Sequence, residues 1–245
     1  MLRYGPALGL MAFSILIAAA LADDATDKLL RAASVQAEQG DYGNAVDALS
    51  TVIKQEPDRA IAYYLRGRSY YCLGKMKESV ADFDRYVQLD PKAESRQWER
   101  GIALYHAGEY ERGAKQFELY QTYHDNDVEN STWRYLCVAK WKNVEEAKKT
   151  LLPIKNDTRV PMMQIYDLYA GKLTPEDVLK AVEKDSPNEN ARDARLFYAH
   201  LYIGLWYEAA GKTDLAAKHV IESEKHKIGH YMWDVARVHN ELRKK

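Results

Sequence analysis

The sequence contains one short turn three times, as Gln39-Gly40-Asp41-Tyr42, Leu73-Gly74-Lys75-Met76 and Ala107-Gly108-Glu109-Tyr110. The same spacing separates Gly40 from Gly74 and Gly74 from Gly108. Apolar residues on both sides of the turn recur at spacings of three and four, which is typical of helices. A glycine can end a helix in the left-handed conformation that other residues avoid. These stretches therefore predict helical hairpins that repeat with this period.

Other positions share the period. A small residue lies five positions after each glycine: Ala45, Ser79 and Gly113. A larger apolar residue lies nine positions after each glycine: Leu49, Phe83 and Phe117. A small residue lets the second helix of a hairpin approach the first closely, and the residue one turn later fills the same seam. Arg66-Gly67 and Arg100-Gly101 repeat with the same spacing, and Pro57 and Pro91 close two units. A unit of this kind resembles the tetratricopeptide repeat.

The period divides the chain. The predicted units are 26–59, 60–93 and 94–127, followed by a degenerate unit at 128–155, and they form an N-terminal array over 23–155. An irregular helical hairpin is expected over 156–192, with Thr174 capping its second helix ahead of Pro175. The segment 193–245 then supplies a final repeat and a C-terminal capping helix from His230 to about Arg243. We expect an all-α solenoid.

The segment 1–22 differs from the rest of the chain. Arg3 precedes an apolar run from Ala7 to Leu21, which ends in the small-residue pattern Ala20-Leu21-Ala22. This is typical of a secretory signal peptide. The alternative is an uncleaved membrane anchor, although a spanning helix needs roughly 20 apolar residues. We predict cleavage after Ala22 and a soluble exported protein, periplasmic or secreted, with no membrane span after cleavage.

Composition narrows the class of function. The formal net charge is -1, with 47% hydrophobic and 29% charged residues. The chain has no excess of basic residues, so its charge gives no sign of a nucleic-acid partner. Its apolar content argues against disorder throughout the chain. The two cysteines, Cys72 and Cys137, fall in the first helices of units with a whole hairpin between them. Because a bridge needs Cα atoms within about 7 Å, two free thiols are predicted.

Repeat order suggests a subfamily. The order of Arg100-Gly101-Ile102-Ala103-Leu104-Tyr105, Trp133-Arg134-Tyr135-Leu136 and Phe197-Tyr198-Ala199-His200-Leu201, with an irregular hairpin before the last, resembles the NlpI-type tetratricopeptide proteins of the bacterial envelope. The resemblance implies a non-catalytic adaptor, often a homodimer, that docks envelope proteases and cell-wall hydrolases. Members of that family are typically lipoproteins, whereas the signal region here has no cysteine to carry a lipid.

The sequence gives little sign of catalysis. His226 and His230 are four apart, with Glu222 and Glu224 nearby, but Gly229 is expected to break the helix between them. Solvated histidines at a helix end are the preferred interpretation over a metal site. Nucleophile-elbow, phosphate-loop and paired-cysteine motifs do not occur. We predict no catalytic residue, no cofactor and no metal.

The first helices of the units line the concave face of such an array, and we expect a partner there. The candidate partner-binding residues are Tyr64, Arg68, Tyr71, Trp98 and Tyr105. Aromatic side chains with an arginine form a rigid surface that can take a peptide or a helix. The alternative is that Tyr64, Tyr71 and Trp98 only pack between neighbouring helices.

The leading hypothesis is therefore a protein-binding scaffold in the bacterial envelope, with other proteins or peptides as partners. Two alternatives stay open: a structural or assembly subunit of a secretion or pilus machine, and an enzyme that uses the region 153–192 or the surroundings of His226.

Overall fold

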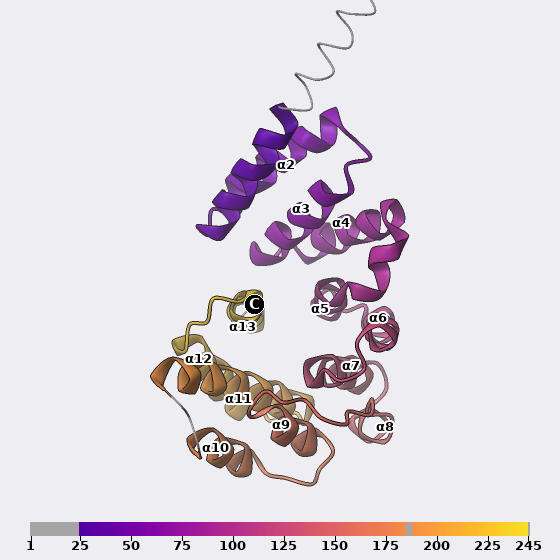
Figure 1. Ribbon diagram of the computed structural model, residues 1–245. Coiled ribbons are helices and arrows are strands. Elements are labelled where there is room, and N and C mark those ends of the chain that lie inside the picture. Colours follow the sequence, from indigo (N-terminus) through magenta and orange to yellow (C-terminus); the bar gives the residue numbers. More distant parts are fainter. Residues whose placement is uncertain (1–24, 185–187, 245) are drawn as a thin grey trace, which may run out of the picture.

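The computed structural model describes residues 25–184 and 188–244, and in these ranges it contains helices and no strand. A first helix covers 25–38. The elements that follow are α2 (Tyr42–Gln55), α3 (Ala60–Cys72), α4 (Met76–Leu89), η1 (Pro91–Arg96), α5 (Trp98–His106), α6 (Tyr110–Tyr123), α7 (Val128–Trp141), α8 (Val144–Lys149), α9 (Met162–Tyr169), α10 (Pro175–Glu183), α11 (Glu189–Ala209), α12 (Thr213–Lys225) and α13 (Tyr231–Arg243). The predicted all-α, tetratricopeptide-like solenoid is confirmed (Figure 1).

Left-handed glycines end the first helix of the hairpins, as the sequence predicted. The φ angles of Gly40, Gly74 and Gly108 are 81°, 72° and 80°. This conformation lets the next residue's N–H reach back five positions, for example from Lys75 to the carbonyl of Tyr70 over 2.9 Å. The chain thus reverses over a short turn, and the two helices of a hairpin lie antiparallel.

Close contact between the paired helices explains why glycine occurs within the first helix of a hairpin, as at Gly101 and Gly204. A Cβ placed on Gly101 would lie 2.6 Å from the Phe117 ring, and one on Gly204 would lie 2.8 Å from a methyl group of Val220. Both glycines lie on the first helix of a hairpin, and the side chains that they admit lie on the second. The paired helices can therefore approach until the ring or the branched side chain fills the seam.

A row of arginines links neighbouring helices along the array, within a hairpin at Arg66 and between adjacent hairpins at Arg100 and Arg134. Arg66 makes a bidentate pair with Asp82 at 2.7 and 2.8 Å. Arg100 contacts Asp84 at 2.7 Å, and Arg134 contacts Glu118 at 2.7 Å. Arg134 extends the regular spacing of Arg66 and Arg100.

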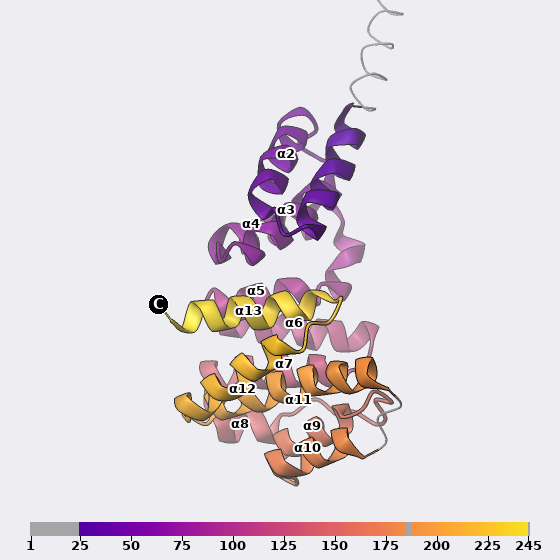
Figure 2. The same cartoon turned by 90° about the vertical axis from the view of Figure 1, so that its left-hand side faces the viewer.

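The last helices turn back into the concave side of the array. α11 packs on α7 and α9, and α12 packs on α11. α13 contacts α12, as expected of a capping helix, but it also contacts α3 in the second hairpin. The two views show α13 lying beside α5 on the inner side of the solenoid (Figures 1 and 2).

Thr174 caps α10 with a capping box to Asp177, and Pro175 is its first residue, as predicted. The predicted signal peptide over 1–22 lies outside the described residues. Within the described part of the chain, no helix combines the length and the apolar character needed to cross a membrane.

Candidate functional site: the concave face

The chain's own C-terminal helix fills the middle of the concave face. Tyr231 is the first residue of α13, and the guanidinium of Arg68 lies over its ring, 4.3 Å from the ring centroid. Its ring is 5.7 Å from that of Tyr71 and 5.8 Å from that of Trp98. His230, just before α13, stacks on Trp98 at 6.2 Å. Aromatic contacts of this kind stabilise a packed pair beyond the area that they bury.

Polar contacts fix the same helix at its middle. The hydroxyl of Tyr42, on α2, donates to Asp234 over 2.9 Å. Arg237 donates to the carbonyl of Cys72 over 3.0 Å. α13 is therefore held by the first and second hairpins, which lie near the opposite end of the chain sequence.

A buried chain of side chains holds the far end of α13. Tyr71 contacts Nδ1 of His106 at 3.1 Å, and Nε2 of His106 lies 2.9 Å from Nδ1 of His239. His239 in turn contacts Glu208 at 2.9 Å. Burial, and then the neighbouring His239, lower the pKa of His106 to about 3.

Glu208 is the charged end of this chain. Burial alone would raise its pKa, but the hydrogen bond and charge of His239, together with Lys140 and Arg243, lower the pKa of Glu208 to about 2. A neutral imidazole at His106 and an ionised carboxylate at Glu208 are thus the states that this packing favours.

Of the five residues predicted to bind a partner, Arg68, Tyr71 and Trp98 lie against Tyr231 of α13. Tyr71 and Tyr105 are buried, whereas the repeat pattern predicted that they lie on an exposed face. The reason is that α13 and its neighbours cover them: Tyr71 packs on Tyr231, and the Tyr105 hydroxyl donates to Glu208 over 3.4 Å. Tyr64 donates to the buried Glu99 over 2.7 Å.

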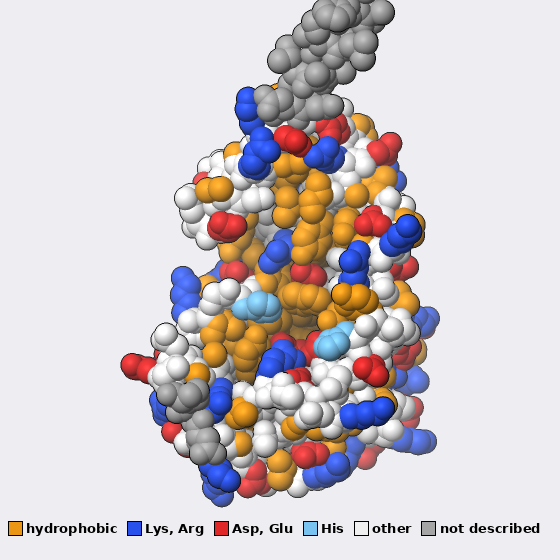
Figure 3. Space-filling model, in the orientation of Figure 1, with side chains coloured by type: hydrophobic (Ala, Val, Ile, Leu, Met, Phe, Trp, Pro, Cys, Tyr) orange, Lys and Arg blue, Asp and Glu red, His pale blue; other side chains and the backbone are white. Residues whose placement is uncertain are grey.

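Arg68 and Trp98 are the two of the five that line hollows. Arg68 lies at the edge of an open groove of about 900 Å³ between the first hairpin and the segment 227–241. The groove is apolar over Leu49 and Leu65, and Leu73 on its rim is 40% exposed. Figure 3 shows apolar side chains running along this face from the first hairpin toward the middle of the molecule.

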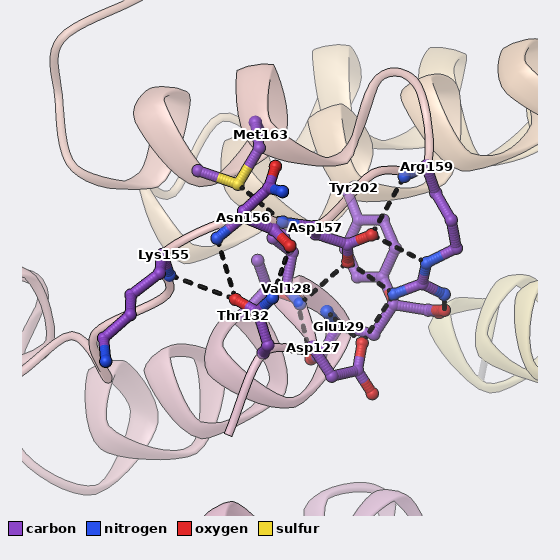
Figure 4. A network of polar contacts seen from close by, with 11 residues as sticks. Asp127, Val128, Glu129, Thr132, Lys155, Asn156, Asp157, Arg159, Met163 and Tyr202 are labelled. Atoms are coloured by element: carbon purple, nitrogen blue, oxygen red, sulfur yellow. Dashed lines mark hydrogen bonds and ion pairs between the residues drawn. The ribbon is translucent and has the colours of Figure 1, made fainter. Parts of the chain in front are cut away.

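Trp98 lines a smaller cavity of about 200 Å³, deeper in the concave face. Its wall includes Asp127, at the start of α7, together with Glu129 and Arg159. Arg159, from the loop before α9, contacts Asp127 and Glu129 at 2.7 Å each and Asp157 at 2.6 Å (Figure 4).

Glu129 differs from the other carboxylates of this network because it is disfavoured in its ionised form. The hydroxyl of Tyr202 donates to it over 2.6 Å (Figure 4). Burial, followed by the charge of Asp127, raises the pKa of Glu129 to about 7. This network was not predicted, because nothing in the local sequence brings Arg159 to the start of α7.

The histidines considered for a metal site are separated. His226 contacts Asp193 at 3.0 Å, whereas His230 stacks on Trp98. Among the described residues, no group of three or more His, Cys, Asp or Glu side chains is placed to hold a metal ion. Both cysteines are free and buried, and burial raises the pKa of Cys72 to about 12, so its thiol is not a ready nucleophile.

Comparisons with known proteins agree with this fold. The stretch 30–94, which covers most of the first two hairpins, matches the family described as tetratricopeptide repeat. A tetratricopeptide repeat protein from Parabacteroides merdae superposes with a TM-score of 0.53 at 13% identity, over 90% of this chain and 84% of that one. MamA 41-end from Desulfovibrio magneticus RS-1 gives 0.51 at 13% identity, over 83% and 95%. At this identity the likeness is one of fold.

Proposed function

We propose that this protein is a non-catalytic adaptor of the bacterial cell envelope, which holds a peptide segment or helix of another protein in the open groove between its first hairpin and α13. The observation that carries the proposal is the groove of about 900 Å³ with an apolar floor and Arg68 at its edge. Its size is at the upper end of the range for binding pockets, which is roughly 300–1,000 Å³.

The groove has the chemistry of a protein-binding surface. Tyr42, Tyr231 and Trp233 line it together with Arg68 and Arg237. Aromatic residues and arginine are enriched among the residues that dominate binding energy. Both arginines are already held over tyrosine rings, Arg68 at 4.3 Å and Arg237 at 5.9 Å, so a partner would meet pre-ordered side chains.

The five residues predicted from sequence take two roles in this proposal. Arg68 contacts the partner directly, and Trp98 lies next to the groove, below His230. Tyr64, Tyr71 and Tyr105 support these positions, and Tyr71 would contact a partner only after α13 moves away. The alternative of pure packing applies to these three more than to Arg68.

The proposed location is the periplasm or beyond, and the proposed partners are other envelope proteins and a second copy of the chain. The predicted signal segment supports export to the periplasm or beyond, and the resemblance to NlpI-type proteins supports envelope proteases or cell-wall hydrolases as partners and a homodimer as the assembly. Leu215 and Ile221 on α12 are 41% and 46% exposed, so a second copy could cover them. Replacing both with glutamate and measuring the mass in solution tests the dimer.

A photo-crosslinking experiment tests the groove. A photoreactive phenylalanine analogue replaces Leu73 on the rim, and in a matched control it replaces Tyr123, which is 59% exposed at the end of α6. We expect crosslinks to specific envelope proteins from position 73 and none of the same proteins from position 123. Equal capture at both positions would contradict a groove-based function.

Direct binding separates contact from packing. Arg68→Ala should weaken the affinity for a captured partner by roughly thirtyfold while leaving most of the protein folded, because interface anchors cost about 2 kcal/mol on truncation. Trp98→Ala is measured in parallel, with melting temperature and affinity both recorded. A single partner recovered in fixed stoichiometry would instead favour a structural subunit of an assembly.

A further inference from the structure

α13 lies on the inner side of the array in the way that a bound helix would, along α3 and α5 (Figure 2). Its first residue, Tyr231, places an aromatic ring against Tyr71 and Trp98. One turn later, Asp234 accepts from the hydroxyl of Tyr42 over 2.9 Å. A helix that binds a groove through residues spaced by three or four is a common mode of peptide recognition. These contacts therefore define a helix-binding surface, and its present occupant is the last helix of the same chain.

A short connection joins α13 to the helix before it. α12 ends at Lys225 and α13 begins at Tyr231. Gly229 in this connection is exposed, and a Cβ on it would meet nothing within 4 Å, so no packing fixes the chain at that point. A short tether holds its two ends at an effective concentration of about 1 mM. α13 can therefore fill the surface even where its fit is incomplete.

Two polar groups at the start of α13 have no matching partner. The hydroxyl of Tyr231 is buried without a hydrogen-bond partner. The guanidinium of Arg68 lies over the rings of Tyr64 and Tyr231, and among the described residues it makes no ion pair. The carboxylate whose charge acts on it, Glu99, accepts from Tyr64, and burial raises the pKa of Glu99 and so disfavours its ionised form. A better-matched occupant would supply what α13 lacks here, a carboxylate for Arg68.

We propose that the surface under α13 binds a helix of a partner protein, which displaces α13 and which carries a carboxylate at its start for Arg68, followed by an aromatic residue in the place of Tyr231. Arg68 and Tyr231 also line the open groove, so a partner that enters the groove reaches the start of α13 first. The free protein is closed by its own last helix, and a helix that fits better opens it. The inference rests on the proposed function for the partner being a protein, and it adds the chemistry of the partner and its competition with α13.

A synthetic peptide that copies α13 tests the surface without a partner. The peptide covers 227–243, carries a fluorophore at its C-terminal end, and is titrated by fluorescence anisotropy against the full chain. In one full-chain variant, the double variant, Tyr231→Ala and Asp234→Ala together weaken the hold of the chain's own α13 and leave the array unchanged. We expect the peptide to bind the double variant with a Kd on the order of 10 μM, and the wild type at least about tenfold more weakly, because the tethered helix competes. Lys218→Ala, at an exposed residue of α12, should behave as the wild type does.

Two conservative changes show whether the peptide binds in the position of α13. In the double variant, Tyr42→Phe removes the hydroxyl that would donate to Asp234 of the peptide, so it should weaken peptide binding about fivefold. Tyr63→Phe is the matched control, because the Tyr63 hydroxyl donates to the carbonyl of Pro57 outside the groove. It should leave the affinity unchanged.

The carboxylate is tested in the peptide itself. His230 precedes α13 and, like Arg68, lines the groove. A peptide with His230→Asp should bind the double variant about fivefold more tightly than the parent peptide, because the new carboxylate pairs with Arg68. Most of this gain should disappear when the protein also carries Arg68→Gln, whereas a gain from better capping of the helix would stay. An equal gain with and without Arg68→Gln would contradict the pairing.

Hydrogen exchange in the wild-type chain does not depend on any variant. About 1 mM unlabelled peptide is added to the ¹⁵N-labelled protein, and amides of the protein's own α13 should then exchange at least about tenfold faster, because a displaced helix loses its protection. Amides of α9, which packs on α7, α10 and α11, should not change. Unchanged exchange in α13, no binding of the peptide to the double variant, or equal binding to the double variant and the wild type would each overturn the inference.

Capture from position 73 is the separate readout of the proposed function. If the peptide does not bind and partner proteins are still captured, the inference fails while the groove function stands. If the peptide displaces α13 and nothing is captured, the helix-binding surface stands and the groove function fails.

Discussion

Nε2 of His106 lies 2.9 Å from Nδ1 of His239, although the two histidines are far apart in the sequence. This contact joins the third hairpin to the last helix, and through Glu208 it also joins that helix to α11. The concave face of the solenoid is therefore closed in its middle by its own C-terminus. What stays open is the groove next to the first hairpin and the small cavity beside Trp98.

Removing this contact should loosen α13. His239→Ala leaves the charged Glu208 with fewer partners in a buried place, so we expect the free energy of unfolding to fall by about 2 kcal/mol. Urea denaturation measures it, and faster hydrogen exchange in α13 should accompany it. His124→Ala, at an exposed histidine after α6, should change stability by less than about 0.5 kcal/mol. An unshifted urea midpoint for His239→Ala would show that α13 is held by other contacts.

Acid should weaken the fold through His106. Its pKa of about 3 lies below the ordinary value of 6.5, so the unfolded chain takes up the proton first as the pH falls. The titratable groups around it are Tyr71, Tyr105, His239 and Glu208. The contribution of His106 to the free energy of unfolding is fully present above pH 6.5 and is lost as the pH falls toward 3. At pH 4 the loss is on the order of 3 kcal/mol.

The test for His106 is the slope of stability against pH between 6.5 and 4. His106→Gln cannot take up this proton, so its slope should be shallower than that of the wild type, whatever its absolute stability. His124→Gln should keep the wild-type slope. Parallel curves for the wild type and His106→Gln would contradict a depressed pKa in the folded protein.

Glu129 should act in the opposite direction. Burial and Asp127 raise its pKa to about 7, so the folded protein holds a proton there that the unfolded chain releases near pH 4.5. The other charged or titratable groups around it are Arg159, Tyr202 and Tyr198. Its contribution is most favourable below pH 4.5 and is lost as the pH rises through about 7.

The difference in the free energy of unfolding between the wild type and Glu129→Gln isolates this contribution, because the contributions of all other groups cancel. We expect the variant to gain about 3 kcal/mol relative to the wild type between pH 4.5 and 8. Thermal denaturation across that range measures it. A constant difference would mean that Arg159 offsets the effects of burial and of Asp127 on Glu129.

Two glycine substitutions should change the stability of the fold in opposite directions. A Cβ at Gly101 would meet the Phe117 ring at 2.6 Å, so Gly101→Ala should destabilise by about 1–3 kcal/mol through overpacking. A Cβ at Gly43, inside α2, would meet nothing within 4 Å, so Gly43→Ala should stabilise by roughly 0.5–1 kcal/mol through helix propensity. Equal melting temperatures for the two variants would be inconsistent with the close approach of α5 and α6.

The sequence by itself determined the repeating part of this protein. The helices, their glycine turns and the close contact at Gly101 depend on residues within a single repeat unit, so a periodic pattern is enough to predict them. Left-handed φ angles at Gly40, Gly74 and Gly108 follow from the same local cause. Arg68 and Trp98 were placed on the concave side for this reason too.

Only the tertiary structure decided what covers that side. The contacts of Tyr231 with Arg68, of His239 with His106, and of Arg159 with Glu129 join segments that are distant in the sequence, and no local period records them. The sequence therefore predicted an open row of aromatic residues, whereas the structure buries Tyr71 beside Tyr231 of the last helix and Tyr105 against Glu208 of α11. The physical reason is that a solenoid leaves its inner apolar surface unpaired, and the C-terminal helix of the same chain is tethered close enough to cover part of it.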